Sequence, residues 1–300
     1  MTGQVSPSRL LVLGDGLSDS GRFGVLTDAA YPPSPPFHDG RWTNGPTWVE
    51  TLASRLGWDL DPADNLAQGG ATTGHLNINE PLRGPLQLGP DAPIRGVLAQ
   101  VEVLADRRPL DPAALYVIWA GGHDVGAFLD YGEPDPFRYP PSANVEAAVR
   151  ILAAAGARRF LLPTMPDVGA SPAYAGSDRA GTATAICEAL NSGIAVIADG
   201  LPGELNVEII VFDAAAVFIS IASDPAAYGI THIGAAYLPD DQIDFANPLR
   251  ARHEIPAHRT GVDPDAFMSF WSLAPGRRVH DALAAAAANL LSAYFDVRER

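Results

Sequence analysis

Short apolar runs alternate with stretches of helical periodicity along the chain. Runs typical of buried strands are Leu10–Leu13, Leu115–Ala120, Phe160–Pro163 and Val207–Phe212. Helical spacing of apolar residues predicts helices at Thr47–Leu56, Val145–Ala155, Ala180–Ala198 and Val279–Tyr294. This alternation predicts an α/β fold, in which a parallel sheet has helices on both faces. Because ligands bind beyond the carboxyl ends of such strands, Gly14–Ser18 and Gly121–Asp124 should face one crevice.

Two segments lack a periodic pattern, namely Gly21–Pro46, which is rich in proline, glycine and aromatic residues, and residues 223–278. Long irregular segments in a compact domain are usually functional loops, so we expect both to cover the site. The sequence has no internal repeat and no linker composition. Residues 1–300 are therefore expected to form a single domain.

Composition excludes several classes of protein. Apolar residues make up 47% and charged residues 18% of the chain, which supplies material for a large core. The net charge of −15 argues against partners such as nucleic acid and anionic membranes. The N-terminus does not resemble a signal peptide, and no apolar stretch looks long enough to span a bilayer. We therefore expect a cytoplasmic protein, with its oligomeric state left open.

The candidate chemistry includes no metal or cofactor. The single cysteine, Cys187, cannot form a disulfide within the chain, and its Ala-rich helical surroundings favour a core thiol. Several histidines are scattered and form no convincing metal-ligand set; these are His38, His75, His232, His253 and His258.

The first strand leads into Leu11–Gly21, whose GDGLSDSG resembles the block G-D-S-L-S-D-x-G of GDSL (SGNH) esterases and lipases. Further stretches resemble later blocks of the family in the expected order. They are Gly40–Glu50, Asn65–Thr72, Ile118–Asp124, Leu162–Pro172, Asp224–Thr231 and a degraded block at Phe270–Arg277. The resemblance covers about residues 9–290. It implies a single-domain, flavodoxin-like three-layer sandwich.

The chain departs from the family at the positions of the catalytic residues. By this resemblance, Gly16 replaces the serine nucleophile and His123 the oxyanion-hole asparagine. Ser272 replaces the triad aspartate, and Ala274 or Pro275 replaces the triad histidine, while Gly70 matches the oxyanion-hole glycine. Glycine has no hydroxyl, and alanine or proline cannot accept a proton. The resemblance therefore implies that serine esterase chemistry has been lost.

The remaining polar groups suggest another chemistry. With no side chain at Gly16, room should be left for His123 to face Asp15, and the carboxylate should then raise the pKa of the imidazole. Such a pair, or His123 with Asp124, would be a serviceable acid–base couple. Gly70 and the backbone around Gly16 could still donate N–H groups to a carbonyl oxygen.

Other interpretations of the same residues stay open. Asp15 and Asp124 could instead brace their loops, and His123 could reflect drift. We expect Ser18 and Asp19 to brace the first turn, and His280 to match a second, structural histidine of the family. The loop over the site should be held by aromatic and polar side chains, with Trp42, Trp271 and Ser272 as walls of a substrate pocket. The other loop residues of this kind are Arg41, Asn44 and Trp48.

We therefore expect an enzyme of lyase, isomerase, dehydratase or cyclase type that acts on a small molecule with a carbonyl or acyl group. High alanine, glycine, proline and arginine usage suggests a bacterium of high GC content, where such enzymes serve natural product biosynthesis. Two alternatives remain: a non-catalytic small-molecule-binding protein, and a residual hydrolase that uses no serine.

Overall fold

A four-stranded parallel sheet forms the centre of the protein. The structure is a computed structural model that describes residues 6–7, 9–132, 134–238, 255 and 257–295. The strands β1 (Leu10–Gly14), β2 (Leu115–Trp119), β3 (Arg159–Pro163) and β4 (Glu208–Phe212) lie in the order β1-β2-β3-β4. All residues of β1 and β2 are buried, as the near-continuous apolar runs predict for strands covered on both faces.

Residues 64–68 extend the sheet beyond β1. Asn65 pairs with Val12 in parallel, and the N–H groups of Leu66 and Gln68 donate to the carbonyls of Val12 and Gly14 at 2.8 and 3.0 Å. Counted with this segment, the strand order becomes 2-1-3-4-5, which is the flavodoxin-like arrangement. The expected fold class is therefore confirmed.

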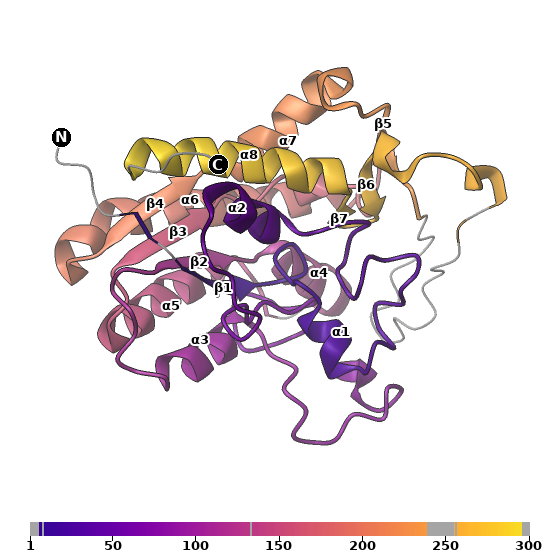
Figure 1. Ribbon diagram of the computed structural model, residues 1–300. Coiled ribbons are helices and arrows are strands. Elements are labelled where there is room, and N and C mark those ends of the chain that lie inside the picture. Colours follow the sequence, from indigo (N-terminus) through magenta and orange to yellow (C-terminus); the bar gives the residue numbers. More distant parts are fainter. Residues whose placement is uncertain (1–5, 8, 133, 239–254, 256, 296–300) are drawn as a thin grey trace.

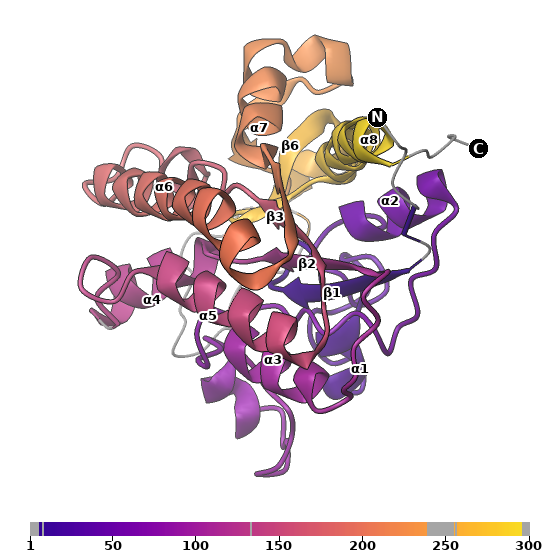
Figure 2. The same cartoon turned by 90° about the vertical axis from the view of Figure 1, so that its left-hand side faces the viewer.

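Helices cover both faces of the sheet (Figures 1 and 2). One face carries α3 (Val97–Ala105), α5 (Pro141–Ala155) and α6 (Ala180–Leu205), and the other carries α2 (Trp48–Leu56) and α8 (Arg277–Tyr294). The shorter helices are α1 (Arg22–Leu26), α4 (Gly122–Tyr131) and α7 (Ala214–Ser223). The four predicted strands and the four predicted helices are all present, with ends that shift by up to seven residues at the C-terminus of α6.

A second, smaller sheet occupies part of the C-terminal segment that showed no periodicity. It consists of β5 (His232–Ala236), β6 (Phe267–Trp271) and β7 (Ala274–Pro275). Short 3-10 turns complete the structure: η1 (Glu80–Arg83), η2 (Val168–Ala170), η3 (Pro225–Tyr228), η5 (Ala257–Arg259) and η6 (Pro264–Ala266). Residues 239–254 and 256 of the predicted C-terminal loop lie outside the described residues.

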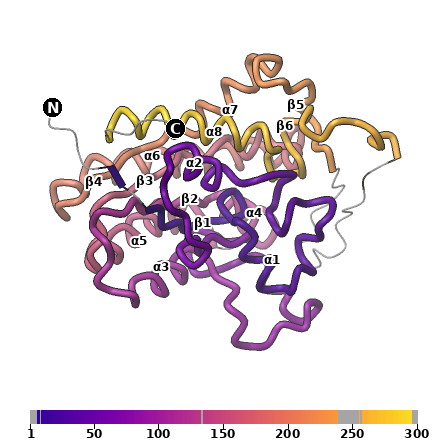
Figure 3. The backbone as a smooth tube through the Cα atoms, in the orientation of Figure 1, coloured from indigo at the N-terminus to yellow at the C-terminus, as the bar shows by residue number. Residues whose placement is uncertain are grey.

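The N-terminal loop and the second sheet share an aromatic cluster. Figure 3 traces the chain between α1 and α2 past the segment labelled β6, and Figure 1 labels the neighbouring β7. Phe37 packs edge-on against Phe270, with ring centroids 5.4 Å apart, and the hydroxyl of Thr43 donates to the carbonyl of Pro275 at 2.9 Å. These contacts bring the two irregular segments of the sequence together at one end of the central sheet.

Helix α6 corrects one expectation from the sequence. By length and composition alone it would be long and apolar enough to cross a membrane, although no such stretch was expected. In the fold it packs beside α5 and against β4, and its residues Ile186, Leu190 and Ile194 belong to the main core. The core of an α/β domain accounts for such a helix without a membrane.

Candidate active site

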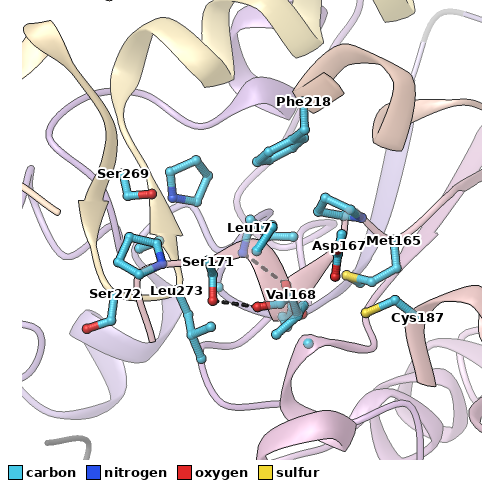
Figure 4. Close-up of a pocket in the computed structure, with 18 of the residues that line it drawn as sticks. Leu17, Met165, Asp167, Val168, Ser171, Cys187, Phe218, Ser269, Ser272 and Leu273 are labelled. Carbon is cyan, nitrogen blue, oxygen red and sulfur yellow. Dashed lines mark hydrogen bonds between the residues drawn. The ribbon is translucent and has the colours of Figure 1, made fainter. Parts of the chain in front are cut away.

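A cavity of about 710 Å³ opens beyond the carboxyl ends of the central strands. Its walls come from the segments that follow β1, β2 and β3, from α6 and α7, and from the second sheet. One side is apolar, and Figure 4 shows part of it together with neighbouring polar groups. The apolar lining includes Leu17, Met165, Val168, Phe218, Ile219, Met268 and Leu273.

Most residues singled out in the sequence lie around this cavity. The lining contains Asp15, Gly16, Trp42, Gly70, His123, Trp271 and Ser272. Asp124 is absent from it. Both irregular segments contribute walls, because Trp42 comes from the first and Trp271 from the second.

Asp15 is a buried carboxyl group at the end of β1. Its Oδ1 accepts the N–H of Leu17 at 3.0 Å, and none of the described residues donates to its Oδ2. Burial raises the pKa of Asp15 to about 7, and the nearby charges of Asp124 and Asp19 contribute to this rise. A carboxyl group with this pKa exists in both protonation states near neutral pH, which suits it to proton transfer.

His123 lies in the first turn of α4, on the cavity wall. Its Nδ1 is buried and has no hydrogen-bond partner among the described residues. Burial lowers the pKa of His123 to about 4, so the ring is neutral at physiological pH. In the described part of the chain, no hydrogen bond or ion pair joins it to Asp15.

The expected rise of the histidine pKa is therefore wrong, and no direct hydrogen bond joins His123 to Asp15 among the described residues. Oδ1 of Asp15 is turned toward the backbone of Leu17, and no carboxylate compensates for the desolvation of the imidazole. Both side chains line the same cavity, and no hydrogen bond or ion pair between them is present in the described part of the chain.

Asp124 and Asp19 brace loops. Both carboxylate oxygens of Asp124 accept from Thr73, one from its N–H at 2.9 Å and one from its hydroxyl at 2.6 Å. Asp19 accepts the N–H groups of Gly69 and Arg22. Burial raises the pKa of each carboxyl group to about 6. The structure thus turns Asp124 toward Thr73 and away from the cavity.

Trp42 fills the space next to Gly16. A Cβ atom built on Gly16 would lie 3.3 Å from Cγ and Cδ1 of Trp42, so no open space lies in the direction of a side chain at this position. The expectation of room above Gly16 is therefore wrong. A Cβ on Gly69 would lie only 2.0 Å from Nε1 of Trp42. The indole thus packs between Gly16 and Gly69, and it stacks on Trp271 with ring centroids 5.9 Å apart.

Two backbone N–H groups on the cavity wall are unused. Among the described residues, neither the N–H of Gly16 nor that of Gly70 donates a hydrogen bond. Gly70 has a φ of +84°, and a Cβ there would lie 2.4 Å from Nδ2 of Asn79, so only glycine fits. Free N–H groups at the edge of a cavity can hold a carbonyl oxygen.

His280 is a second neutral histidine on the cavity wall. Its Nδ1 accepts the N–H of Trp48 at 3.1 Å, so the neutral ring carries its proton on Nε2. Burial lowers the pKa of His280 to about 4. By the family resemblance, His280 was expected to be structural. In the sequence, His280 follows closely after the block that contains Ser272. This proximity was the feature that could have indicated a position in the site.

Neither a thiolate nor a metal cluster is present in the described part of the site. Cys187 lies on the cavity wall, where burial raises the pKa of its thiol to about 11 and keeps it protonated. The described residues contain no group of three or more histidine, cysteine, aspartate or glutamate side chains that could hold a metal ion.

The fold and the cavity define an α/β protein with its site at the carboxyl end of a parallel sheet. Residues 10–254 match the GDSL-like Lipase/Acylhydrolase family. The chain therefore belongs to this family, which confirms the resemblance inferred from the sequence blocks.

Individual relatives support this assignment. The chain is 31% identical over 166 residues to phosphatidylcholine-sterol acyltransferase of Aeromonas hydrophila, covering 55% of this chain and 46% of that protein. It is 30% identical over 171 residues to Lipase 1 of Photorhabdus luminescens, covering 55% of this chain and 23% of that protein. The matched part thus spans less than half the length of these relatives.

A solved structure shares the fold. A GDSL-like lipase from Parabacteroides merdae superimposes with a TM-score of 0.50 at 12% identity, covering 96% of this chain and 98% of that chain. At this identity the likeness shows the fold alone.

Proposed function

We propose that this member of the GDSL-like family binds a small molecule with a carbonyl group and moves protons on it without forming an acyl-serine. Gly16 supports this proposal, because it supplies no hydroxyl where the family resemblance places the nucleophile. The chemistry would be that of an isomerase, lyase, dehydratase or cyclase. A biosynthetic role and a cytoplasmic location stay predictions from the sequence.

The carbonyl oxygen would accept the unused N–H groups of Gly16 and Gly70. Hydrogen bonds to this oxygen stabilise the negative charge that develops when a proton leaves the adjacent carbon. Asp15, as the carboxylate, would remove that proton. Return of the proton to another carbon gives isomerisation, and departure of a leaving group gives elimination.

One observation carries the proposal: a carboxyl group with a pKa of about 7 lies next in sequence to a free N–H on the same cavity wall. A base with this pKa combines deprotonation near neutral pH with useful basicity. His123, which is neutral at this pH, would serve as a second proton donor or acceptor across the bound molecule.

The test needs no knowledge of the natural substrate. We would follow the exchange of the hydrogens next to the carbonyl of 2-octanone in D₂O by NMR, with and without protein. Asp15→Asn keeps the oxygen that accepts from Leu17, and we expect it to lower protein-dependent exchange by at least about 10²-fold, as for other general bases. Asp124→Asn is the matched control. It should keep the exchange activity, because the Asp124 carboxylate is bound to Thr73.

Exchange by wild-type protein that survives in Asp15→Asn would contradict the role of Asp15. Binding of the ketone without any exchange would favour a non-catalytic binding protein. Loss of exchange in Asp124→Asn, with the fold intact, would move the acid–base role to that residue.

A further inference from the structure

Asn79 lies on the cavity wall, and one of its polar atoms has no hydrogen-bond partner among the described residues. Its backbone N–H donates to Oδ1 of Asn77 at 2.9 Å, and its carbonyl accepts from Leu82 at 2.9 Å. Its side-chain Nδ2 donates to the carbonyl of Gly69 at 2.9 Å. Only Oδ1 is without a partner among the described residues, although Asn79 is 5% exposed.

The direction of the amide is fixed by its neighbours. Rotating the group by 180° would bring Oδ1 against the carbonyl oxygen of Gly69, where two acceptors repel each other. Asn79 precedes the 3-10 turn η1, but its side chain does not cap that turn. Oδ1 is also not among the enclosed side-chain atoms that lack a partner. The cavity is therefore what this oxygen can reach.

The position of this acceptor relative to Gly70 decides what it can recognise. A Cβ on Gly70 would lie 2.4 Å from Nδ2 and 2.8 Å from Cγ of Asn79, so the amide lies directly beside the backbone of Gly70. The unused N–H of Gly70 and the unused oxygen of Asn79 thus form a neighbouring donor and acceptor. A ligand with an acceptor and a donor on neighbouring carbon atoms suits such a pair.

We propose that Asn79 is a substrate-binding residue that selects carbonyl compounds with a hydroxyl or N–H group on the carbon next to the carbonyl. This inference rests on the proposed function, in which the carbonyl oxygen binds the N–H groups of Gly16 and Gly70. The neighbouring hydroxyl or N–H then donates to Oδ1 of Asn79. A site with a buried acceptor discriminates against analogues without the donor, because the acceptor stays unpaired.

Three matched probes test the proposal by calorimetry or ligand-observed NMR: 1-hydroxy-2-octanone, 2-octanone and 1-methoxy-2-octanone. The first offers a donor next to the carbonyl, the second lacks it, and the third has an oxygen that can only accept. We expect the hydroxyketone to bind about 3- to 10-fold more tightly than the other two, the range that one hydrogen bond supports.

The variant Asn79→Leu keeps the size of the side chain but lacks Oδ1. We expect it to bind 2-octanone still, and to bind the hydroxyketone with about the same affinity as 2-octanone. Asn191→Leu is the control. Asn191 also lines the cavity, but both ends of its amide already bond the backbone of Met165, at 2.7 and 2.8 Å. The hydroxyketone preference should therefore persist in that variant.

Equal binding of the three probes by the wild-type protein would overturn the role of Asn79, as would a preference that survives in Asn79→Leu. Failure of all three to bind would overturn the proposed function itself and this inference with it. If Asn79→Leu does not fold, a crystal structure of the wild type with the hydroxyketone decides. The probe hydroxyl must lie within about 3.2 Å of Oδ1 of Asn79.

Discussion

The indole of Trp42 lies against Gly16, at the point from which a side chain of residue 16 would extend. The ring is held from several sides, since its Nε1 donates to Asp19 at 3.3 Å and it stacks on Trp271. A larger residue at position 16 must therefore displace a tryptophan that other contacts keep in place. The surroundings of position 16 therefore favour glycine, because a larger residue would press against Trp42.

A hydroxyl introduced at position 16 should not produce an esterase. In Gly16→Ser the new Cβ would meet Trp42 at 3.3 Å, and we expect a loss of about 1 kcal/mol in the free energy of unfolding. His280 cannot activate the alcohol through Nδ1, because that atom accepts from Trp48, and Ala274 or Pro275 stands where the family resemblance places the triad histidine. Turnover of p-nitrophenyl acetate should stay at background. Turnover well above it would show that His123 or His280 already serves as the base.

Covalent serine probes should not label the wild-type protein. Of the serines near the site, Ser171 donates its hydroxyl to the carbonyl of Val168 at 2.6 Å (Figure 4), and Ser18 accepts from the indole of Trp48 at 3.0 Å. We expect intact mass spectrometry after treatment with a fluorophosphonate to show no adduct. An adduct mapped to any of these serines would contradict the proposal that the protein acts without an acyl-serine.

The two glycines that flank Trp42 should differ in their tolerance of a methyl group. In Gly69→Ala the new Cβ would fall 2.0 Å from Nε1 of Trp42, against 3.3 Å for the nearest atom in Gly16→Ala. We expect the first variant to lose about 3 kcal/mol or more and the second about 1 kcal/mol. Urea unfolding followed by tryptophan fluorescence measures both. Equal losses of stability in the two variants would show that Trp42 can shift to accommodate either methyl group.

The pH dependence of exchange should follow Asp15. Because the carboxylate is the base, the rate of 2-octanone exchange should rise as the pH increases through about 7 and then level off. His123, with its pKa of about 4, should add no inflection between pH 5 and 6.5. His123→Ala should lower the rate without shifting the inflection or the melting temperature. A variant with full exchange activity would remove His123 from the mechanism.

The buried histidine at position 280 should make stability depend on pH. Its pKa is about 4 in the folded state against 6.5 ordinarily, so the unfolded chain binds more protons between these values. Stability from this group is therefore complete above pH 6.5 and is lost as the pH falls toward 4. In His280→Asn an oxygen can replace Nδ1 as the acceptor for Trp48 without titrating.

Between pH 7 and 4, the wild type should lose about 3 kcal/mol more stability than this variant, as measured by urea unfolding at each pH. The comparison cancels the opposite contribution of Asp15, whose pKa is raised and which is present in both proteins. Parallel pH profiles for the two proteins would show that His280 is not held neutral by the fold.

The sequence was informative where local pattern decides structure. Runs of leucine, valine and isoleucine located all four strands of the central sheet, and the strand-end rule placed Asp15 and His123 on one cavity. Helix α7 was missed because its sequence, AAAVFISIAS, is apolar on all sides and shows no periodicity. The second sheet was missed because β7 has only two residues and pairs through tertiary contacts.

The details of the site depend on side-chain directions that no local pattern encodes. Whether a carboxylate reaches the ring of His123 is decided by the turn that directs Asp15 to Leu17. The place of Trp42 beside Gly16 follows from a loop of irregular structure. The unpartnered Oδ1 of Asn79 can be recognised only from the structure, once the hydrogen bonds of its other polar atoms are known.

The hydrogen bond from Trp48 to His280 joins residues 232 positions apart. At a synthesis rate of about 5–20 residues per second, roughly 10–50 s pass between the appearance of the donor and that of its acceptor. During this time α2 lacks the helix α8 that covers it in the finished fold. The ribosome must therefore release nearly the whole domain before α8 can cover α2 and His280 can take its place on the cavity wall.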